Sequence, residues 1–174
     1  MQIYLLDLDP TSCAQMLDDK SLDKQIKAIA NVLCEVHYEL QMLGLEKDTY
    51  IPSFKNPTRT SIWCEWASKY RANYSFLVNL LDACLEELLY RSEVDDSFYF
   101  YNKNRLIYEW ARDNRSVLPD HLKTPFPLVI PKKFVDSNDS IVTSYRRAYA
   151  YKKLRTENRD TYTWTQRNKP DWLL

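Results

Sequence analysis

Two long stretches of the chain repeat apolar residues at every third or fourth position, and this spacing constrains the fold more than any other feature. The first stretch runs from Leu22 to Leu40 and the second from Ile62 to Leu88. Such spacing places apolar side chains along one face of an α-helix. The sequence therefore predicts two long amphipathic helices, each forming one wall of a shared core.

Residues that favour helix ends indicate where the elements begin and end. Asp9-Pro10 is typical of a helix start, because Asp accepts bonds from free N–H groups and Pro has none to satisfy. Gly44, the only glycine among 174 residues, suits the C-terminal cap of the first long helix. Further helices are expected around 102–114, with Leu106, Ile107, Trp110 and Ala111 facing inward, and over 137–155.

Other stretches are not expected to be helical. Four prolines between Leu118 and Pro131 exclude a regular helix, so this stretch should cross the surface as an extended strap. Ile3–Leu6 is too short for its pattern to separate a strand from an anchored segment. Together these features predict a mainly α fold: one helical bundle domain over 1–174, with a proline-rich strap and an irregular C-terminal tail.

Composition excludes several classes of site. A chain with one glycine has no Gly-rich phosphate loop and no dinucleotide fingerprint. Its four cysteines form no C-x-x-C pair and it has two histidines, so we expect no metal site and no cofactor. The sequence has no apolar run long enough for a membrane span and does not begin like a signal peptide. We therefore expect a cytoplasmic protein.

Charge is distributed unevenly along a chain whose net charge is zero. Residues 1–60 hold six Lys or Arg against nine Asp or Glu, whereas 141–174 hold eight against three. This C-terminal segment interleaves its cations with aromatic residues, a combination that suits phosphates and bases. The alternative is that the aromatic rings pack on the core while the cations stay in water. Its candidate ligand-binding residues are Tyr145, Arg146, Trp164 and Arg167.

A second candidate surface lies on the first long helix. Lys20, Lys24, Lys27 and Asn31 fall on one face, with Asp19 and Asp23 beside them. Such a face could bind a phosphate and position a carboxylate for acid or base chemistry. The alternative is a solvated face with Asp–Lys pairs.

A third candidate is the loop that leads into the second long helix. Asn56 and Arg59 lie in this loop and Arg71 follows it, and polar groups at a helix start are a common anion-binding arrangement. The alternative is that the same residues form an ordinary turn, followed by a helix cap at Thr60 or Ser61.

Several of these motifs together resemble a family of uncharacterised proteins found widely in phages. The resemblance covers nearly the whole chain but implies no particular reaction. The shared motifs include both the C-terminal segment and Asp19-Lys20, so we expect these two parts of the chain to form the two halves of one site. The matching motifs are Ile3–Pro10 with Cys13-Ala-Gln and Asp19-Lys20, Asn56-Pro57 with Ile62-Trp63, Arg71–Tyr74, Thr124-Pro-Phe with Pro131, and Tyr145-Arg146 through Trp164, Arg167, Pro170 and Trp172.

The N-terminal third is more remotely similar to phage pyrimidine-dimer DNA glycosylases of the endonuclease V type. In those enzymes the α-amine of an N-terminal threonine attacks the sugar C1′ and a glutamate assists. Here Gln2 takes the place of the threonine, so the amine would be that of Met1, and Asp23 takes the place of the glutamate. An α-amine is a suitable nucleophile because its pKa is near neutrality.

The resemblances and charges give one leading functional prediction and one alternative. The leading prediction is a phage-type enzyme that acts on DNA or nucleotides and cleaves a base–sugar bond, located in the host cytoplasm if phage-encoded. Asp23, Asp19 and Met1 would be catalytic. The alternative is a non-catalytic protein that sequesters a nucleotide or binds nucleic acid or a host protein.

Overall fold

The computed structural model describes residues 2–47, 50–52, 61–92, 96–155 and 162–173. Within these ranges the chain forms helices and no strand, which confirms the mainly α fold. Three short 3₁₀ turns accompany the α-helices in the described residues. The elements are α1 (Pro10–Gln15), α2 (Asp19–Met42), α3 (Ile62–Ala67), α4 (Arg71–Arg91), α5 (Asp96–Asn114), η1 (Arg115–Val117), η2 (Lys132–Phe134), α6 (Ile141–Leu154) and η4 (Asp171–Leu173).

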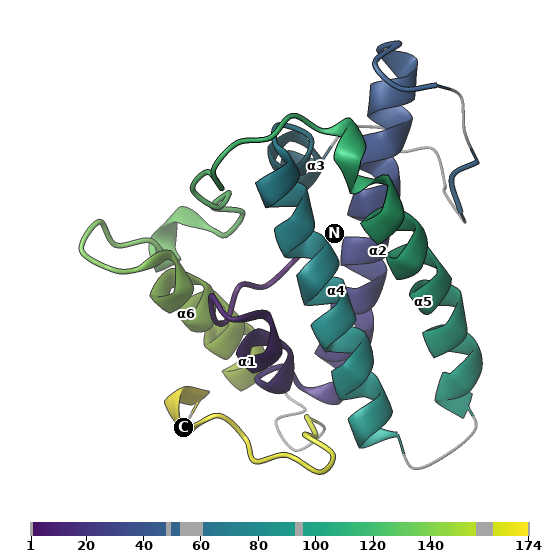
Figure 1. The fold of residues 1–174 in the computed structure, drawn as a ribbon. Helices are drawn as coiled ribbons and strands as arrows, with labels where there is room; N and C mark the ends of the chain where they lie inside the picture. Colours follow the sequence, from purple (N-terminus) through teal and green to yellow (C-terminus); the bar gives the residue numbers. More distant parts are fainter. Residues whose placement is uncertain (1, 48–49, 53–60, 93–95, 156–161, 174) are drawn as a thin grey trace.

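The three longest helices pack side by side and enclose most of the core. Figure 1 shows α4 running antiparallel to both α2 and α5, so α2 begins, α4 ends and α5 begins at the same end of the bundle. Leu33, Leu77 and Leu81 are completely buried between these helices. The two apolar stripes in the sequence therefore form the predicted core walls.

The first predicted helix is divided in two, because a second cap follows soon after the first. Asp9 caps α1 by accepting from the Ser12 N–H at 2.7 Å. Asp18 then adopts an extended conformation (φ −69°, ψ 161°), and its carboxylate accepts from the Ser21 N–H to cap α2. The sequence predicted a helix start at Asp9-Pro10 and an end at Gly44, but it did not predict this break between them.

The second predicted helix is divided as well. Tyr70 is extended (φ −148°, ψ 147°) and separates α3 from α4. Ser61 caps α3 by accepting from the Cys64 N–H, as expected for this position. The side of α3 that faces the core does not include Ile62. This residue is therefore 54% exposed and does not belong to the core stripe.

Three smaller predictions were also wrong. The third helix begins at Asp96, earlier than expected, and Leu106 is 64% exposed where the sequence suggested an inward side chain. Ile107 and Ala111 are buried as predicted, so the inward face is rotated away from Leu106. The last helix is capped by Ser140, just beyond the predicted residues.

Gly44 ends α2 as predicted. Its φ of 69° lies in the left-handed region, where a residue without Cβ carries no steric penalty. The N–H groups of Gly44 and Leu45 donate to the carbonyls of Gln41 and Leu40. This pair of bonds is the Schellman arrangement, which satisfies carbonyls left free at the end of a helix.

The strap at 118–131 is extended and is fastened to the bundle at several points. The Tyr145 hydroxyl donates to the Pro127 carbonyl at 2.8 Å and accepts from the Val129 N–H at 3.1 Å. The Asn73 side chain bonds both the N–H and the hydroxyl of Thr124. After the strap, α6 lies against the N-terminal segment, where Arg146 contacts Leu6 and Asp7 (Figure 1).

Candidate functional site

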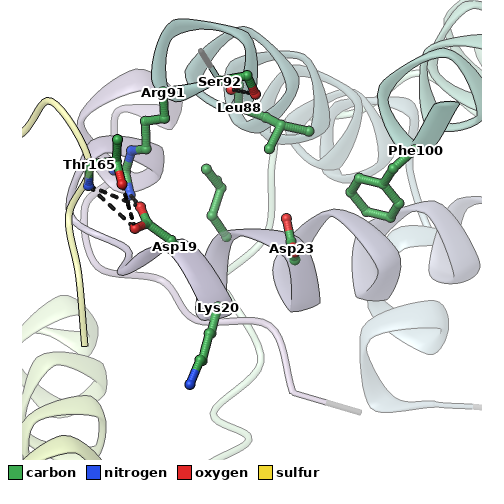
Figure 2. Close-up of a pocket in the computed structure, with 9 residues that line it drawn as sticks. Asp19, Lys20, Asp23, Leu88, Arg91, Ser92, Phe100 and Thr165 are labelled. Atoms are coloured by element: carbon green, nitrogen blue, oxygen red, sulfur yellow. Dashed lines mark hydrogen bonds and ion pairs between the residues drawn. The ribbon is translucent and has the colours of Figure 1, made fainter. Parts of the chain in front are cut away.

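A cleft of about 420 Å³ opens at the end of the bundle where α2 begins, α4 ends and α5 begins (Figure 2). Its volume is within the range of small-molecule sites in proteins. Apolar side chains form part of its wall, and two carboxylates of α2 lie within it. The cleft is lined by Asp19, Lys20, Leu22, Asp23, Leu88, Arg91, Ser92, Phe100 and Thr165.

Asp19 joins the start of α2 to the C-terminal tail. Its Oδ2 accepts from the hydroxyls of Thr163 and Thr165 at 2.5 and 2.9 Å, and its backbone N–H donates to the Thr163 carbonyl at 2.9 Å. The Thr165 N–H also donates to this carboxylate. The tail therefore lies against the first long helix, as the sequence predicted.

Arg91 supports Asp19 from inside the protein. Its Nη1 donates to Asp19 Oδ1 at 2.9 Å and to the Leu17 carbonyl at 2.8 Å. Its Nη2 donates to the Gln15 carbonyl, and its Nε to Glu87 Oε1 at 2.7 Å. With only 4% of its side chain exposed, this guanidinium is fixed by four partners, which lie in α1, in the turn after α1, in α2 and in α4.

The network continues from Glu87 to the tail. Arg167 donates from Nε and Nη2 to the two carboxylate oxygens of Glu87, both at 2.9 Å, and lies 4.0 Å over the Tyr90 ring. Charges therefore alternate from Asp19 through Arg91 and Glu87 to Arg167. This bidentate pair holds the tail against α4.

The two carboxylates of the cleft have pKa values displaced in opposite directions. Burial disfavours the charged form of Asp19, but hydrogen bonds from Thr163, Arg91 and Thr165 outweigh burial and lower its pKa. For Asp23, burial is the largest effect and raises the pKa; Lys27 opposes the shift, and the negative charge of Asp19 adds to it. Asp19 therefore stays ionised to lower pH than an ordinary aspartate, while Asp23 keeps its proton to higher pH.

The predicted cationic face of α2 is present. Lys20, Lys24, Lys27 and Asn31 are all exposed, as their helical spacing indicated. Lys20 lines the cleft, but Figure 2 shows its ammonium directed away from both aspartates. Lys27 lies 5.0 Å over the Phe100 ring.

The structure uses several predicted ligand-binding residues in internal contacts. Arg146 donates from Nε to the Leu6 carbonyl at 2.7 Å and from Nη2 to Asp7 Oδ2 at 3.1 Å. Trp164 donates from Nε1 to the Met16 carbonyl at 3.1 Å. Arg71 contacts carbonyls at the start of the strap.

The remaining predicted residues are therefore dispersed. Tyr145 is buried beneath the strap, and Arg167 lies in the Glu87 pair outside the cleft. The structure brings Asp19, Lys20 and Asp23 together with Thr165 of the tail. The predicted residues Met1, Asn56 and Arg59 lie outside the described residues.

Sequence reasoning missed four residues that shape the site: Arg91, Glu87, Phe100 and Thr165. Arg91 and Glu87 sit on the apolar second stripe, four positions apart, and buried charges on such a stripe are rare unless paired. Two opposite charges four residues apart on an apolar stripe could therefore have been predicted to form a buried pair with a functional or structural role. Phe100 and Thr165 had no comparable signal, because only the packing of α5 and the tail brings them to α2.

Comparisons with known proteins do not assign this chain to a family. No family model, curated protein or solved structure matches it at a significant level. In the described residues, no three His, Cys, Asp or Glu side chains are close enough together to hold a metal ion. None of the described helices combines the length and apolar character that crossing a membrane requires.

Proposed function

We propose that the chain is an enzyme that cleaves the N-glycosidic bond between a base and its sugar in DNA or a nucleotide, with the cleft as its active site. The observation that supports this most is the pair Asp19 and Asp23, four residues apart on one helix, with oppositely displaced pKa values. Side chains at this spacing lie on the same helix face. Glycosidases use such pairs of one protonated and one ionised carboxyl group.

The chemistry divides between the two carboxyl groups. Asp23 donates its proton to the departing base as the bond from C1′ to the base nitrogen breaks. Asp19 stays ionised through Arg91 and the threonines, and its charge stabilises the positive charge that develops on the sugar. A water molecule attacks C1′ and releases one proton, which restores Asp23. The Phe100 ring provides an apolar wall for the base.

Attack by the Met1 α-amine is the route that the remote resemblance implies. It would displace the base and form a Schiff base with the opened sugar, which borohydride reduces to a stable covalent adduct. Trapping with borohydride therefore separates the amine route from attack by water. An adduct on Met1 supports the amine, whereas base release without an adduct supports water.

Base release from oligonucleotides and from mononucleotides, measured by chromatography, tests the proposal. Asp23→Asn should lower the rate about 10²- to 10⁴-fold, the usual contribution of a general acid. Asp113→Asn is the matched control, because Asp113 is an exposed aspartate of α5 outside the cleft. Equal rates for wild type and Asp23→Asn would overturn the proposal.

The alternative proposal is a non-catalytic protein that binds a nucleotide, a nucleic acid or a host protein. The observation that favours it is the open position of Lys20, Lys24 and Lys27 on α2, where cations can contact phosphates without a pocket. Tight binding of an oligonucleotide with no base released from any substrate would support this alternative.

A further inference from the structure

We propose that the nucleic acid is a single-stranded polymer, bound along a track of five cationic residues that leads from α6 across α2 to the cleft. This inference rests on the proposed function, because it defines the substrate of the same site. The track consists of Lys133, Arg155, Lys152, Lys24 and Lys20, all exposed.

The track begins at a compact cluster around Tyr151. Lys133 Nζ lies 3.9 Å from the Tyr151 ring centroid, and the Arg155 guanidinium carbon lies 4.8 Å from it. Arg155 also donates to the Tyr151 hydroxyl. The hydrogen bond from Lys133 is the largest of the effects that lower the pKa of Tyr151. Two cations held beside one ring form a site for a phosphate group.

Lys152 connects this cluster to α2. Its Nζ donates to the Tyr4 hydroxyl at 3.1 Å, and the Tyr4 backbone forms two hydrogen bonds with the Gln25 side chain, at 2.9 and 2.8 Å. The neighbouring Lys153 bonds Ser21 Oγ at 2.9 Å. Ser21 and Gln25 therefore mark the side of α2 that faces α6 and the N-terminal segment.

Helix geometry places the other two lysines between that side and the cleft. We measure angles around the axis of α2 from Gln25, in the direction that crosses the exposed side of the helix. In this direction Lys24 lies at about 100°, Lys20 at about 140° and Asp23 at about 200°. The opposite direction passes through the buried residues Ile29 and Leu22. The lysines thus bridge the exposed surface from α6 to the carboxyl group of Asp23.

The charges along this path are available to a ligand. Within the described part of the chain, none of the five track cations forms an ion pair with a carboxylate, whereas nearby Arg146, Arg147 and Lys153 pair with Asp7, Asp139 and Asp18. A row of uncompensated cations fits the repeated phosphates of a polymer better than one nucleotide. The cleft of about 420 Å³ admits one unpaired base, so a single strand fits this path better than a duplex does.

Fluorescence anisotropy with a labelled single-stranded oligodeoxynucleotide tests the track, using the Asp23→Asn protein so that little substrate is consumed during the measurement. Each phosphate neutralised contributes about −0.7 to the slope of log K against log salt. The slope should be about −2 or steeper. Replacing Lys24 and Lys152 together with Ala should make it shallower by about 1.4.

A matched double variant controls for net charge. Lys69→Ala with Lys103→Ala removes two exposed lysines outside the track and should leave the slope unchanged. If both double variants made the salt slope shallower by the same amount, the proposed track would be overturned. Tighter binding of the corresponding duplex, or equally effective competition by a mononucleotide, would also overturn it.

The two proposals can fail separately. If the oligonucleotide binds through the track but no base is released by the wild-type protein, the proposed reaction is wrong and the track stands. If bases are released while the Lys24 and Lys152 substitutions leave the salt slope unchanged, the track is wrong and the reaction stands.

Discussion

Arg91 Nη1 lies 2.9 Å from Asp19 Oδ1, and this contact joins the last residue of α4 to the first residue of α2. The same carboxylate receives two hydroxyl groups from the C-terminal tail. A single aspartate therefore connects two core helices with a segment more than 140 residues away in sequence. The position of the cleft depends on this junction.

Arg91→Ala should strongly destabilise the protein. The substitution removes the donor of two buried backbone carbonyls and leaves Glu87 paired with Arg167 alone, and breaking one partner of a buried ion pair costs about 3–5 kcal/mol. Urea unfolding followed by circular dichroism measures the loss. Arg112→Ala, which removes an exposed arginine paired with its neighbour Asp113, should change stability by about 0.5 kcal/mol or less. Similar losses in both variants would contradict the importance of the junction.

Asp19→Asn should loosen the tail at neutral pH. The neutral amide weakens the bond from Arg91 and replaces an acceptor oxygen that Thr163 and Thr165 use. Trypsin should then cleave faster after Arg167, and mass spectrometry identifies the products. Asp113→Asn should leave cleavage at this site unchanged.

The pH dependence of this contact follows from the lowered pKa of Asp19. Because the folded protein holds its pKa below the ordinary 3.8, the ionised carboxylate contributes stability above that value. This contribution is lost as the pH falls through the folded pKa. The difference in urea stability between wild type and Asp19→Asn should therefore shrink below about pH 4. A difference independent of pH would argue against an ionic role.

The helices could be predicted from the sequence because their causes are local. The Leu22–Leu40 stripe, the Asp9-Pro10 start and the Gly44 end depend only on neighbouring residues. The break at Tyr70 was missed because the helical spacing of apolar residues continues across it. The break at Asp18 was missed because it lies between the Asp9-Pro10 start and the stripe, where no apolar pattern indicated a second cap. An aspartate can cap a helix or lie inside one, and the residues next to it in the sequence do not show which of these two positions it takes.

The candidate site was predictable only in part, for a different reason. Asp19, Lys20 and Asp23 are close in sequence, so helix spacing placed them together. Arg146 and Arg167 could not be assigned, because their carboxylate partners, Asp7 and Glu87, come from distant segments. A count of cations along the chain does not show which of them the fold neutralises.

Tyr149→Phe should destabilise the protein by about 1–3 kcal/mol, the cost of leaving a buried polar group without a partner. The Tyr149 hydroxyl donates to Asp18 Oδ2 at 2.5 Å and accepts from the Asp18 N–H at 2.9 Å, and both residues are fully buried. Thermal or urea unfolding measures the change. Tyr99→Phe is the control, because Tyr99 is 79% exposed.

Asp23→Asn should stabilise the protein at neutral pH while it slows the proposed reaction about 10²- to 10⁴-fold. Burial and the charge of Asp19 raise the pKa of Asp23 in the folded state, so ionising it costs folding free energy. Its contribution is fully present below the unfolded value of about 3.8 and is lost as the pH rises through the folded pKa. The variant should therefore unfold at higher urea concentration than wild type at pH 7, and the two midpoints should converge near pH 3 to 4. Asp113→Asn should show no such gain. A loss of stability at pH 7 would mean that the Asp23 carboxylate is stabilised by the fold, which would remove the physical basis for its role as an acid.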